Sequence, residues 1–323
     1  MTDAAHSLKL VFCGTPQFAL PTFASLVAAG HQISLVVSQP DRPVGRDQQL
    51  TAPPVKQMAL AAGIPVVQPE KIRNNQEFRA QLEAIAPDAI VVVAYGRIVP
   101  PWMLALPRLG CINLHASLLP KYRGAAPIQW AIAMGDAFTG NTTMLLEEGL
   151  DTGPILLQQT HEIGTEQTAT ELFPLLAAAG APLVVETLAG LADGTIQPQP
   201  QNHEGATYAP LLNREDGRMD FAARSATELH NRWRGFQPWP GAFTALHGKK
   251  LIVHRMSVAH QSDAEPLGVA APGLVRIENH RLFVACASNT RLEIVEVQLE
   301  GKKRLSAAEF LRGNPLAPDA RLG

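Results

Sequence analysis

The chain has few cysteines, and none of them are paired in sequence. Cys13, Cys111 and Cys286 are the only three among 323 residues, and no CxxC pair occurs. A disulfide framework needs an even set and a thiolate zinc site needs clustered thiols, so the sequence predicts neither. We expect no metal. This cysteine usage is typical of a reducing compartment, so we expect a cytoplasmic protein.

Targeting and membrane-spanning patterns are also missing. The first residues, MTDAAHSLKLVF, show no basic region followed by the apolar region of a secretory signal. The longest apolar stretch, 172–185, is interrupted by Pro174, Gly180 and Pro182 and is too short to cross a bilayer. We therefore expect no membrane association.

The glycine motif of dinucleotide-binding domains is absent as well. The sequence FCGTPQFA (12–19) has only Gly14 where GxGxxG needs three glycines, and Pro16 blocks the usual helix start. This pattern argues against a nicotinamide cofactor at the first strand-to-helix turn.

Charged residues are scarce and unevenly divided. Residues 1–207 hold 11 Lys and Arg against 17 Asp and Glu, a net charge of −6, whereas residues 208–323 hold 16 against 12, a net charge of +4. A basic second part suits a polyanionic partner, although an asymmetry of this size also arises by chance. Charge alone leaves both explanations open.

Apolar periodicity predicts two domains of different class. In the first part, short β-branched runs alternate with helical patterns, which predicts a doubly wound, mostly parallel, Rossmann-like α/β domain over 1–192. Residues 193–208 are polar, contain proline and predict a linker. Strict alternation of apolar and polar residues then predicts a small antiparallel all-β barrel of OB-like type over 209–316, followed by a tail at 317–323.

The segment CINLHASLLP (111–120) is a core strand that turns polar at its end. Side chains alternate along a strand, so Asn113 and His115 share one face while Ile112 and Leu114 share the other. Ligands of open α/β sheets bind at the carboxyl ends of strands, which places this pair at a crevice. The competing explanation is a buried amide and imidazole that are satisfied by the backbone.

A second polar patch is EEGLDTGPI (147–155), where Asp151 stands between Gly149 and Gly153. Acids flanked by glycine usually only form turns. If Asp151 meets His115, however, its charge favours the imidazolium, and the pair can hold or relay a proton. An amide, an imidazole and a carboxylate without a nucleophilic Ser or Cys suit direct acyl transfer to an amine.

Several motifs together resemble one known family. FCGTPQFA, SQPDRPVGR, INLHASLLPKYRGAAPIQWAI, EEGLDTG and GFQPWPGAF are similar to motifs of the formyltransferases that use 10-formyltetrahydrofolate, and within them of the methionyl-tRNA formyltransferases. The resemblance covers about residues 8–315. It implies formyl transfer to the α-amine of methionine on initiator tRNA. It also implies a catalytic trio of Asn113, His115 and Asp151, with the first two stabilising an oxyanion and the third assisting proton transfer.

The resemblance also implies a folate pocket built largely from backbone groups. Its expected residues come from the turn after the strand at 88–96, the SLLP loop and the loop before Asp151, namely Ala94, Tyr95, Gly96, Ile98, Ser117, Leu118, Leu119, Pro120, Gly149 and Leu150. Arg97 stands where the family usually has an apolar residue.

Binding of tRNA is implied for two basic regions. Arg42 and Arg46 lie in the loop SQPDRPVGRDQQLTAPP (38–54), which by resemblance enters the acceptor stem, and the second domain offers Lys249, Lys250, Lys302, Lys303 and Arg304. A solvated surface is the alternative for each of these side chains. We further expect a monomer, and a core position for Trp239.

Two other functions stay open at this point. A formyltransferase that acts on an amino sugar nucleotide shares the catalytic motifs but needs neither the Arg42 loop nor a basic β-domain. A non-catalytic tRNA-binding module needs the basic residues but not the trio of Asn113, His115 and Asp151.

Overall fold

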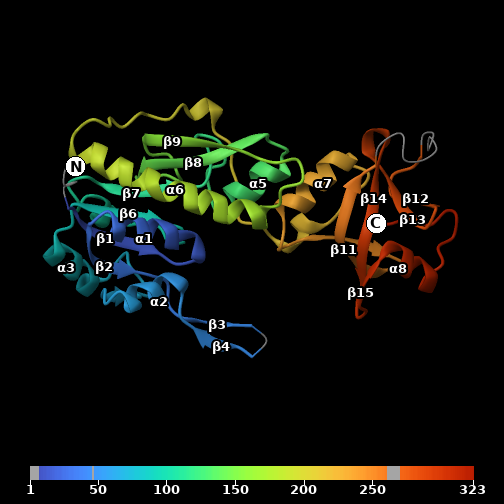
Figure 1. Cartoon of the computed structure of the whole chain (residues 1–323), viewed down its shortest axis with the longest axis horizontal. Coiled ribbons are helices and arrows are strands. Elements are labelled where there is room, and N and C mark those ends of the chain that lie inside the picture. The colour runs from blue at the N-terminus through green and yellow to red at the C-terminus, as the bar shows by residue number, and fades with distance from the viewer. Residues whose placement is uncertain (1–6, 46, 260–269) are drawn as a thin grey trace. The chain divides into compact units, whose positions relative to one another are not determined.

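The computed structural model describes residues 7–45, 47–259 and 270–323, and the chain divides into two compact units (Figure 1). Unit 1 contains Met1–Pro127, Phe138–Glu162 and Glu171–Pro210, and unit 2 contains Ile128–Ala137, Ile163–Thr170 and Leu211–Gly323. Residues 193–210, most of which form the predicted linker, therefore pack within unit 1. There Gln199 pairs with Ile155, and Tyr208 pairs with Arg123.

Unit 1 is built on a seven-stranded sheet of order β5-β2-β1-β6-β7-β8-β9. Its strands are β1 (Lys9–Gly14), β2 (Gln32–Val37), β5 (Val66–Val67), β6 (Ala89–Val93), β7 (Cys111–His115), β8 (Phe138–Leu145) and β9 (Ile155–Glu162). The pairs from β5 to β7 are parallel, while β7–β8 and β8–β9 are antiparallel. The predicted doubly wound, mostly parallel domain is confirmed.

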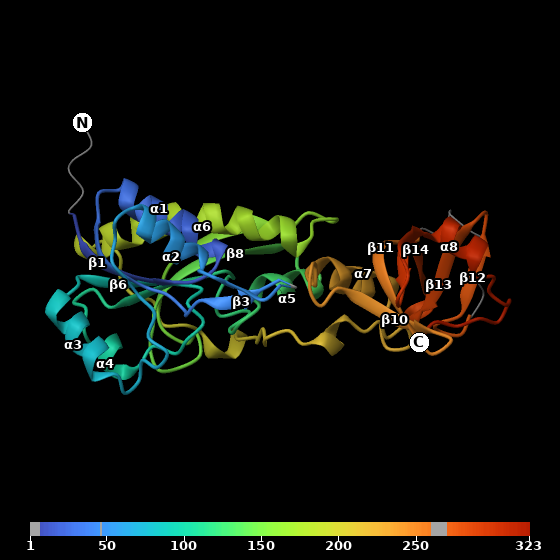
Figure 2. The ribbon, with the colours of Figure 1, turned by 90° about the horizontal axis from the view of Figure 1, so that it is seen from below.

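Helices cover both faces of this sheet. Figure 2 shows one group, α1 (Leu20–Ala28), α2 (Pro54–Ala61) and α6 (Ala169–Ala192), on one side of the sheet, and α3 (Gln76–Ile85) and α4 (Pro101–Leu104) on the other. Two separate apolar cores match these two layers. A strand that lies between two helical layers has no solvent-facing side, which explains its nearly continuous apolar sequence.

Helix α6 is the one helix among the described residues that is long and apolar enough to cross a membrane by length and composition. Its Val184 and Leu188 are fully buried in the same core as Leu114 of β7. The hydroxyl groups of Thr187 and Thr143 lie 2.8 Å apart, which joins the helix to β8. In this fold α6 is therefore a core helix of unit 1.

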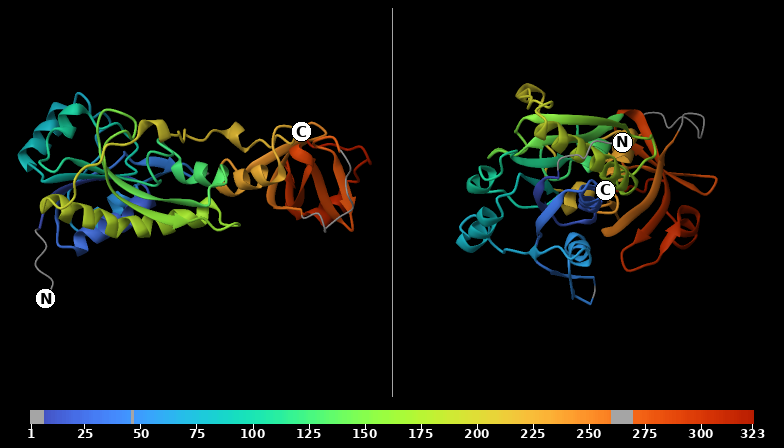
Figure 3. Two further views of the ribbon diagram at one scale, coloured as in Figure 1. Left: turned by 90° about the horizontal axis from the view of Figure 1, so that it is seen from above. Right: turned by 60° about the vertical axis from the view of Figure 1, so that its left-hand side comes forward.

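A short hairpin, β3 (Arg42–Val44) and β4 (Gln49–Thr51), projects from the body of unit 1 (Figures 1 and 3). The sequence predicted only a loop here. Arg42 pairs with Thr51 in the antiparallel register, which gives the projecting segment a defined backbone.

Unit 2 contains an antiparallel sheet of order β10-β11-β14-β13-β12, with β15 paired to β14. The strands are β10 (Ala242–Leu246), β11 (Lys249–Val258), β12 (Val275–Glu278), β13 (Arg281–Cys286), β14 (Thr290–Leu299) and β15 (Arg304–Ser306). The antiparallel β prediction is confirmed. Among the residues described, no strand pairing joins β10 to β12, so hydrogen bonds do not close the sheet into a ring.

Among its described residues, unit 2 also holds three α-helices, the first of which is α5 (Pro127–Ala133). The other two, α7 (Ala226–Gly235) and α8 (Ala307–Gly313), each begin with a capping box, Ser225 with Glu228 and Ser306 with Glu309. Both helices pack into the apolar core of the β-sheet through residues such as Leu229 and Phe310.

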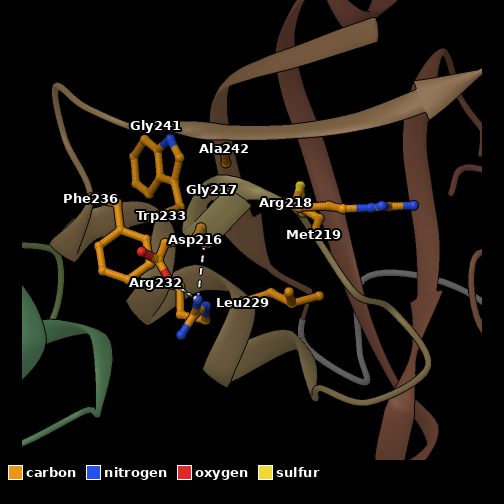
Figure 4. A pocket seen from close by; sticks show the side chains of 10 residues that line it. All are labelled: Asp216, Gly217, Arg218, Met219, Leu229, Arg232, Trp233, Phe236, Gly241 and Ala242. Carbon is orange, nitrogen blue, oxygen red and sulfur yellow. Dashed lines mark hydrogen bonds and ion pairs between the residues drawn. The ribbon is translucent and has the colours of Figure 1, made fainter. Parts of the chain in front are cut away.

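The motif around Trp239 differs from the sequence prediction. Trp239 is 54% exposed, so its predicted core position is wrong, and Phe236 is fully buried instead. Figure 4 shows Arg232, which donates to the Asp216 carbonyl oxygen at 2.9 Å, beside Phe236 in a cavity of about 10 Å³. That volume holds about one water molecule, so the region is structural rather than a ligand site.

Candidate active site

Asn113 and His115 lie on one face of β7. Ile112 and Leu114 are buried in the core formed with α1, α2 and α6, so strand alternation turns Asn113 and His115 toward the opposite face. The predicted same-face arrangement of the two polar side chains is therefore what the structure has. In the parallel pairing, Asn113 is level with Val92, one residue before the end of β6, and this places it near the carboxyl edge of the sheet.

The imidazole of His115 is buried and contacts two groups. Its Nε2 lies 2.9 Å from the carbonyl oxygen of Tyr122. A carbonyl can only accept, so Nε2 carries the proton of that bond. The other nitrogen, Nδ1, lies 3.8 Å from Asp151 Oδ2, which is ion-pair range but too long for a hydrogen bond.

Asp151 lies in the loop between β8 and β9, in a left-handed backbone conformation with φ of 50°. Its Oδ2 accepts a hydrogen bond from the Gly124 N–H at 2.8 Å. The flanking glycines are required by space: a Cβ on Gly153 would lie 1.9 Å from the Leu145 carbonyl oxygen, and one on Gly149 would lie 1.9 Å from the Thr152 hydroxyl. The glycines let the loop fold back so that Asp151 faces His115.

No cysteine in this unit is available as a nucleophile. Burial raises the pKa of the Cys111 thiol to about 12, and burial together with the neighbouring Cys111 raises the pKa of Cys13 well above its usual range. Among the described residues there is also no group of three His, Cys, Asp or Glu side chains that could hold a metal ion.

The SLLP loop after β7 is anchored by side chains of β8 and β9. The Leu119 N–H donates to the Thr142 hydroxyl at 3.1 Å, and Gln158 Nε2 donates to the Leu119 carbonyl oxygen at 2.9 Å. The Ser117 hydroxyl donates to Lys121 within the loop. Ser117 and Leu119 are buried, whereas Leu118 and Pro120 are partly exposed. Of the four predicted folate residues in this loop, only Leu118 and Pro120 therefore have an accessible side chain.

The predicted folate turn after β6 contains both exposed and buried side chains. Ala94 and Gly96 have positive φ angles of 46° and 75°, and Ile98 is 87% exposed. Tyr95 is only 2% exposed, so its side chain belongs to the core. Gln39 Nε2 donates to the carbonyl oxygens of both Tyr95 and Gly96 at 3.1 Å. From the loop before Asp151, Gly149 and Leu150 are also exposed.

Arg42 is exposed on the β3–β4 hairpin, and its Nη2 donates to Gln39 Oε1 at 3.3 Å. Gln39 therefore connects the hairpin to the predicted folate turn. Arg46 lies outside the described residues. Arg97, the residue that departs from the family pattern, donates to the Glu70 carbonyl oxygen.

The predicted lysines of unit 2 gather at one end of its sheet. Leu251 of β11 pairs with Leu299 of β14, and the Glu300 N–H donates to the Lys250 carbonyl oxygen at 2.9 Å. This register brings the start of β11, with Lys249 and Lys250, next to the turn after β14, with Lys302 and Lys303. Lys250 Nζ lies over the Phe243 ring, 3.8 Å from its centroid. Arg304 forms an ion pair with Glu296, so its charge is already balanced.

Sequence reasoning missed a buried polar pair behind the Asp151 loop. Arg123 is 2% exposed and Gln201 is 6% exposed, and they are hydrogen-bonded to each other across 78 positions of sequence. Gln201 also donates to the main chain at Asp151. The only sequence signal was the arginine of the PKYRG element, because Gln201 lies in a stretch whose composition predicts a linker.

Comparison with known proteins places this fold in a class. Family models for "Formyl transferase" and "Formyl transferase, C-terminal domain" match residues 8–188 and 211–315. An N-formyltransferase from Helicobacter canadensis, solved with folinic acid and dTDP-3-aminofucose, has the same fold with a TM-score of 0.64, 18% identity, and coverage of 89% of this chain and 98% of its own. The architecture is thus that of a formyl transferase.

Closer relatives define the family further. The methionyl-tRNA formyltransferase of Acidobacterium capsulatum is 67% identical over 98% of this chain and 100% of its own length. That of Koribacter versatilis is 58% identical over 94% of this chain and 95% of its own length. The chain belongs to the methionyl-tRNA formyltransferase family.

Proposed function

We propose that this chain transfers the formyl group of 10-formyltetrahydrofolate to the α-amine of methionine on initiator methionyl-tRNA. The observation that carries the proposal is the approach of His115 and Asp151 at the end of β7, with Asn113 on the same face of that strand. This arrangement occurs in a chain that matches methionyl-tRNA formyltransferases along its whole length. A neighbour of the same fold was solved with folinic acid, which supports a folate donor.

The reaction assigned to these residues is direct attack of the methionine amine on the formyl group. The amine nitrogen adds to the formyl carbon and forms the new C–N bond, the carbonyl oxygen becomes an oxyanion, and the bond to N10 of the folate then breaks. The attacking amine gives up a proton and the departing N10 takes one, so tetrahydrofolate leaves neutral at that nitrogen. No enzyme-bound acyl group is formed, which agrees with the inert, buried thiols of Cys13 and Cys111.

Each polar residue has a distinct role in this reaction. The Asn113 amide donates a hydrogen bond to the oxyanion. His115 is held through Nε2 by Tyr122, so Nδ1 is the nitrogen that donates to the oxyanion or exchanges a proton. Asp151 lies 3.8 Å from that nitrogen and stabilises the charged imidazolium while the proton moves.

Two basic surfaces are assigned to the tRNA. The β3–β4 hairpin presents Arg42 from unit 1, and the end of the unit 2 sheet presents the positive charges of Lys249, Lys250, Lys302 and Lys303. Phosphate contacts of this kind supply affinity, while the shape of the hairpin reads the end of the stem. Arg304 contributes little because Glu296 neutralises it.

We further assign the enzyme to the cytoplasm as a monomer. All three cysteines are buried and unpaired, which suits a reducing compartment. Light scattering of the purified protein measures the mass directly, and a dimer mass would contradict this assignment.

One assay separates the candidate functions. Purified protein is incubated with 10-formyltetrahydrofolate and either charged initiator tRNA, charged elongator tRNA or an amino sugar nucleotide. We expect product only with initiator methionyl-tRNA. Formylation of the sugar instead would favour the amino sugar function, and tRNA binding without any formylation would favour a binding module.

A further inference from the structure

A buried glutamine, Gln201, holds the loop that carries Asp151. Its Nε2 donates to the carbonyl oxygen of Asp151 at 2.8 Å and to that of Gly153 at 2.7 Å. Both amide protons are therefore used on the loop, one on each side of Thr152. Because the two accepting carbonyls belong to the backbone, the contact restrains the main chain itself rather than a mobile side chain.

Arg123 fixes the orientation of this amide. Its Nε and Nη2 donate to Gln201 Oε1 at 3.1 and 2.7 Å, and its Nη2 lies 3.1 Å from His203 Nδ1. A guanidinium can only donate, so the oxygen of Gln201 must face Arg123 and the nitrogen must face the loop. The contact between the two buried side chains therefore fixes the Gln201 amide in one orientation.

The residue after Arg123 acts on Asp151 directly. The Gly124 N–H donates to the carboxylate of Asp151 at 2.8 Å. Gly124 has φ of 117°, and a Cβ there would lie 2.8 Å from the Ala209 carbonyl oxygen, so only glycine fits. Arg123 and Gly124 thus restrain Asp151 at two points, the main chain through Gln201 and the carboxylate through the backbone amide.

We propose that Gln201, oriented by Arg123, is a positioning residue for formyl transfer. By holding the carbonyl groups of Asp151 and Gly153, it keeps the Asp151 carboxylate at its place beside His115. The proposal rests on the proposed function. Gln201 acts through Asp151 and is not assigned to any step at the reacting atoms.

The first test compares three variants by steady-state kinetics. Gln201→Glu keeps the size and still accepts from Arg123, but it cannot donate to the two carbonyls, and Gln201→Ala removes both contacts. Gln199→Ala is the matched control, because the side chain of this exposed glutamine of the same segment donates to the Gln197 carbonyl oxygen, and its backbone pairing with Ile155 does not depend on the side chain. Since a displacement of about 1 Å can cost on the order of 100-fold in rate, we expect both Gln201 variants to lose about 10- to 100-fold in kcat. KM for tRNA should stay unchanged, and the control should match the wild type.

The second test measures the local stability of the Asp151 loop and does not depend on activity. Hydrogen exchange of the peptide that covers residues 149–153 should accelerate in both Gln201 variants and not in Gln199→Ala. A wild-type kcat for Gln201→Glu would overturn the proposal, as would a lost kcat with unchanged exchange of the loop. Global unfolding of both variants would also overturn it, because the role would then be structural. An inactive wild-type enzyme with accelerated loop exchange in the variants would contradict the proposed function alone.

Discussion

His115 Nδ1 and Asp151 Oδ2 face each other at 3.8 Å, although the two residues come from a strand and from a loop 36 positions later in the chain. The separation leaves Nδ1 without a hydrogen bond to the carboxylate but within its electrostatic reach.

Asp151→Asn keeps the size of the side chain and an oxygen that can accept from Gly124, but it removes the charge beside the imidazole. General acid–base assistance typically contributes about 100- to 10,000-fold, so we expect kcat to fall at least about 100-fold in both Asp151→Asn and His115→Ala. Circular dichroism should show both variants folded. Near-normal single-turnover formylation by either variant would contradict the assigned roles.

Arg42→Ala should mainly impair the use of tRNA. The guanidinium is exposed on the projecting hairpin, and loss of one phosphate contact should reduce the slope of log KM against log salt by about 1. Arg79→Ala is the control, since Arg79 is an exposed cation of the same unit that forms an ion pair with Glu83 on α3 and lies over the Trp102 ring, away from the hairpin. Equal kinetics of Arg42→Ala and wild type at every salt concentration would show that the hairpin arginine does not contact tRNA.

The double variant Lys302→Ala/Lys303→Ala tests the lysine turns of unit 2. Two exposed charges are removed, so we expect weaker tRNA binding and a salt slope that is less steep by about 2. The affinity for the folate donor should not change. Filter binding at several salt concentrations provides the measurement, and a slope identical to that of the Arg304→Ala variant would argue against a phosphate contact.

Gly180→Ala should destabilise the enzyme although alanine is the better helix former. A Cβ on Gly180 would lie 2.7 Å from Leu114 Cδ2, so either the buried Leu114 side chain must leave its rotamer or α6 must move away from β7. Overpacking of this kind costs about 1–3 kcal/mol. Gly313→Ala in α8 is the control, because the space around that Cβ is open and no loss is expected. Urea unfolding of the two variants gives the comparison, and an unchanged midpoint for Gly180→Ala would contradict the close packing.

The sequence was sufficient wherever local periodicity determined the structure. Alternation along β7 predicted that Ile112 and Leu114 are buried and that Asn113 and His115 share the other face, because a side chain in a paired strand has only two directions. It predicted the class of both sheets for the same reason. The sequences SATE and SAAE place Glu three residues after Ser, which is the capping-box pattern at the starts of α7 and α8, but neither helix was predicted.

The parts that sequence missed depend on contacts between distant segments. Gln201 follows a proline and precedes an exposed polar run, and nothing local indicates that it is buried against Arg123. Trp239 is large and apolar, so hydrophobicity predicted burial, yet Phe236 occupies the core beside it. Which of these side chains is buried depends on the space between the packed elements, and composition does not reveal that space.

Gln201 and Ala209 are synthesised after the residues that they contact in unit 1. A nascent chain that has reached residue 192 already contains Asn113, His115 and Asp151 and every strand of the unit 1 sheet. It lacks the segment that receives Arg123 and fits against Gly124. The last part of unit 1 to be synthesised is therefore the part that holds the Asp151 loop, and translation must pass residue 209 before these contacts can form.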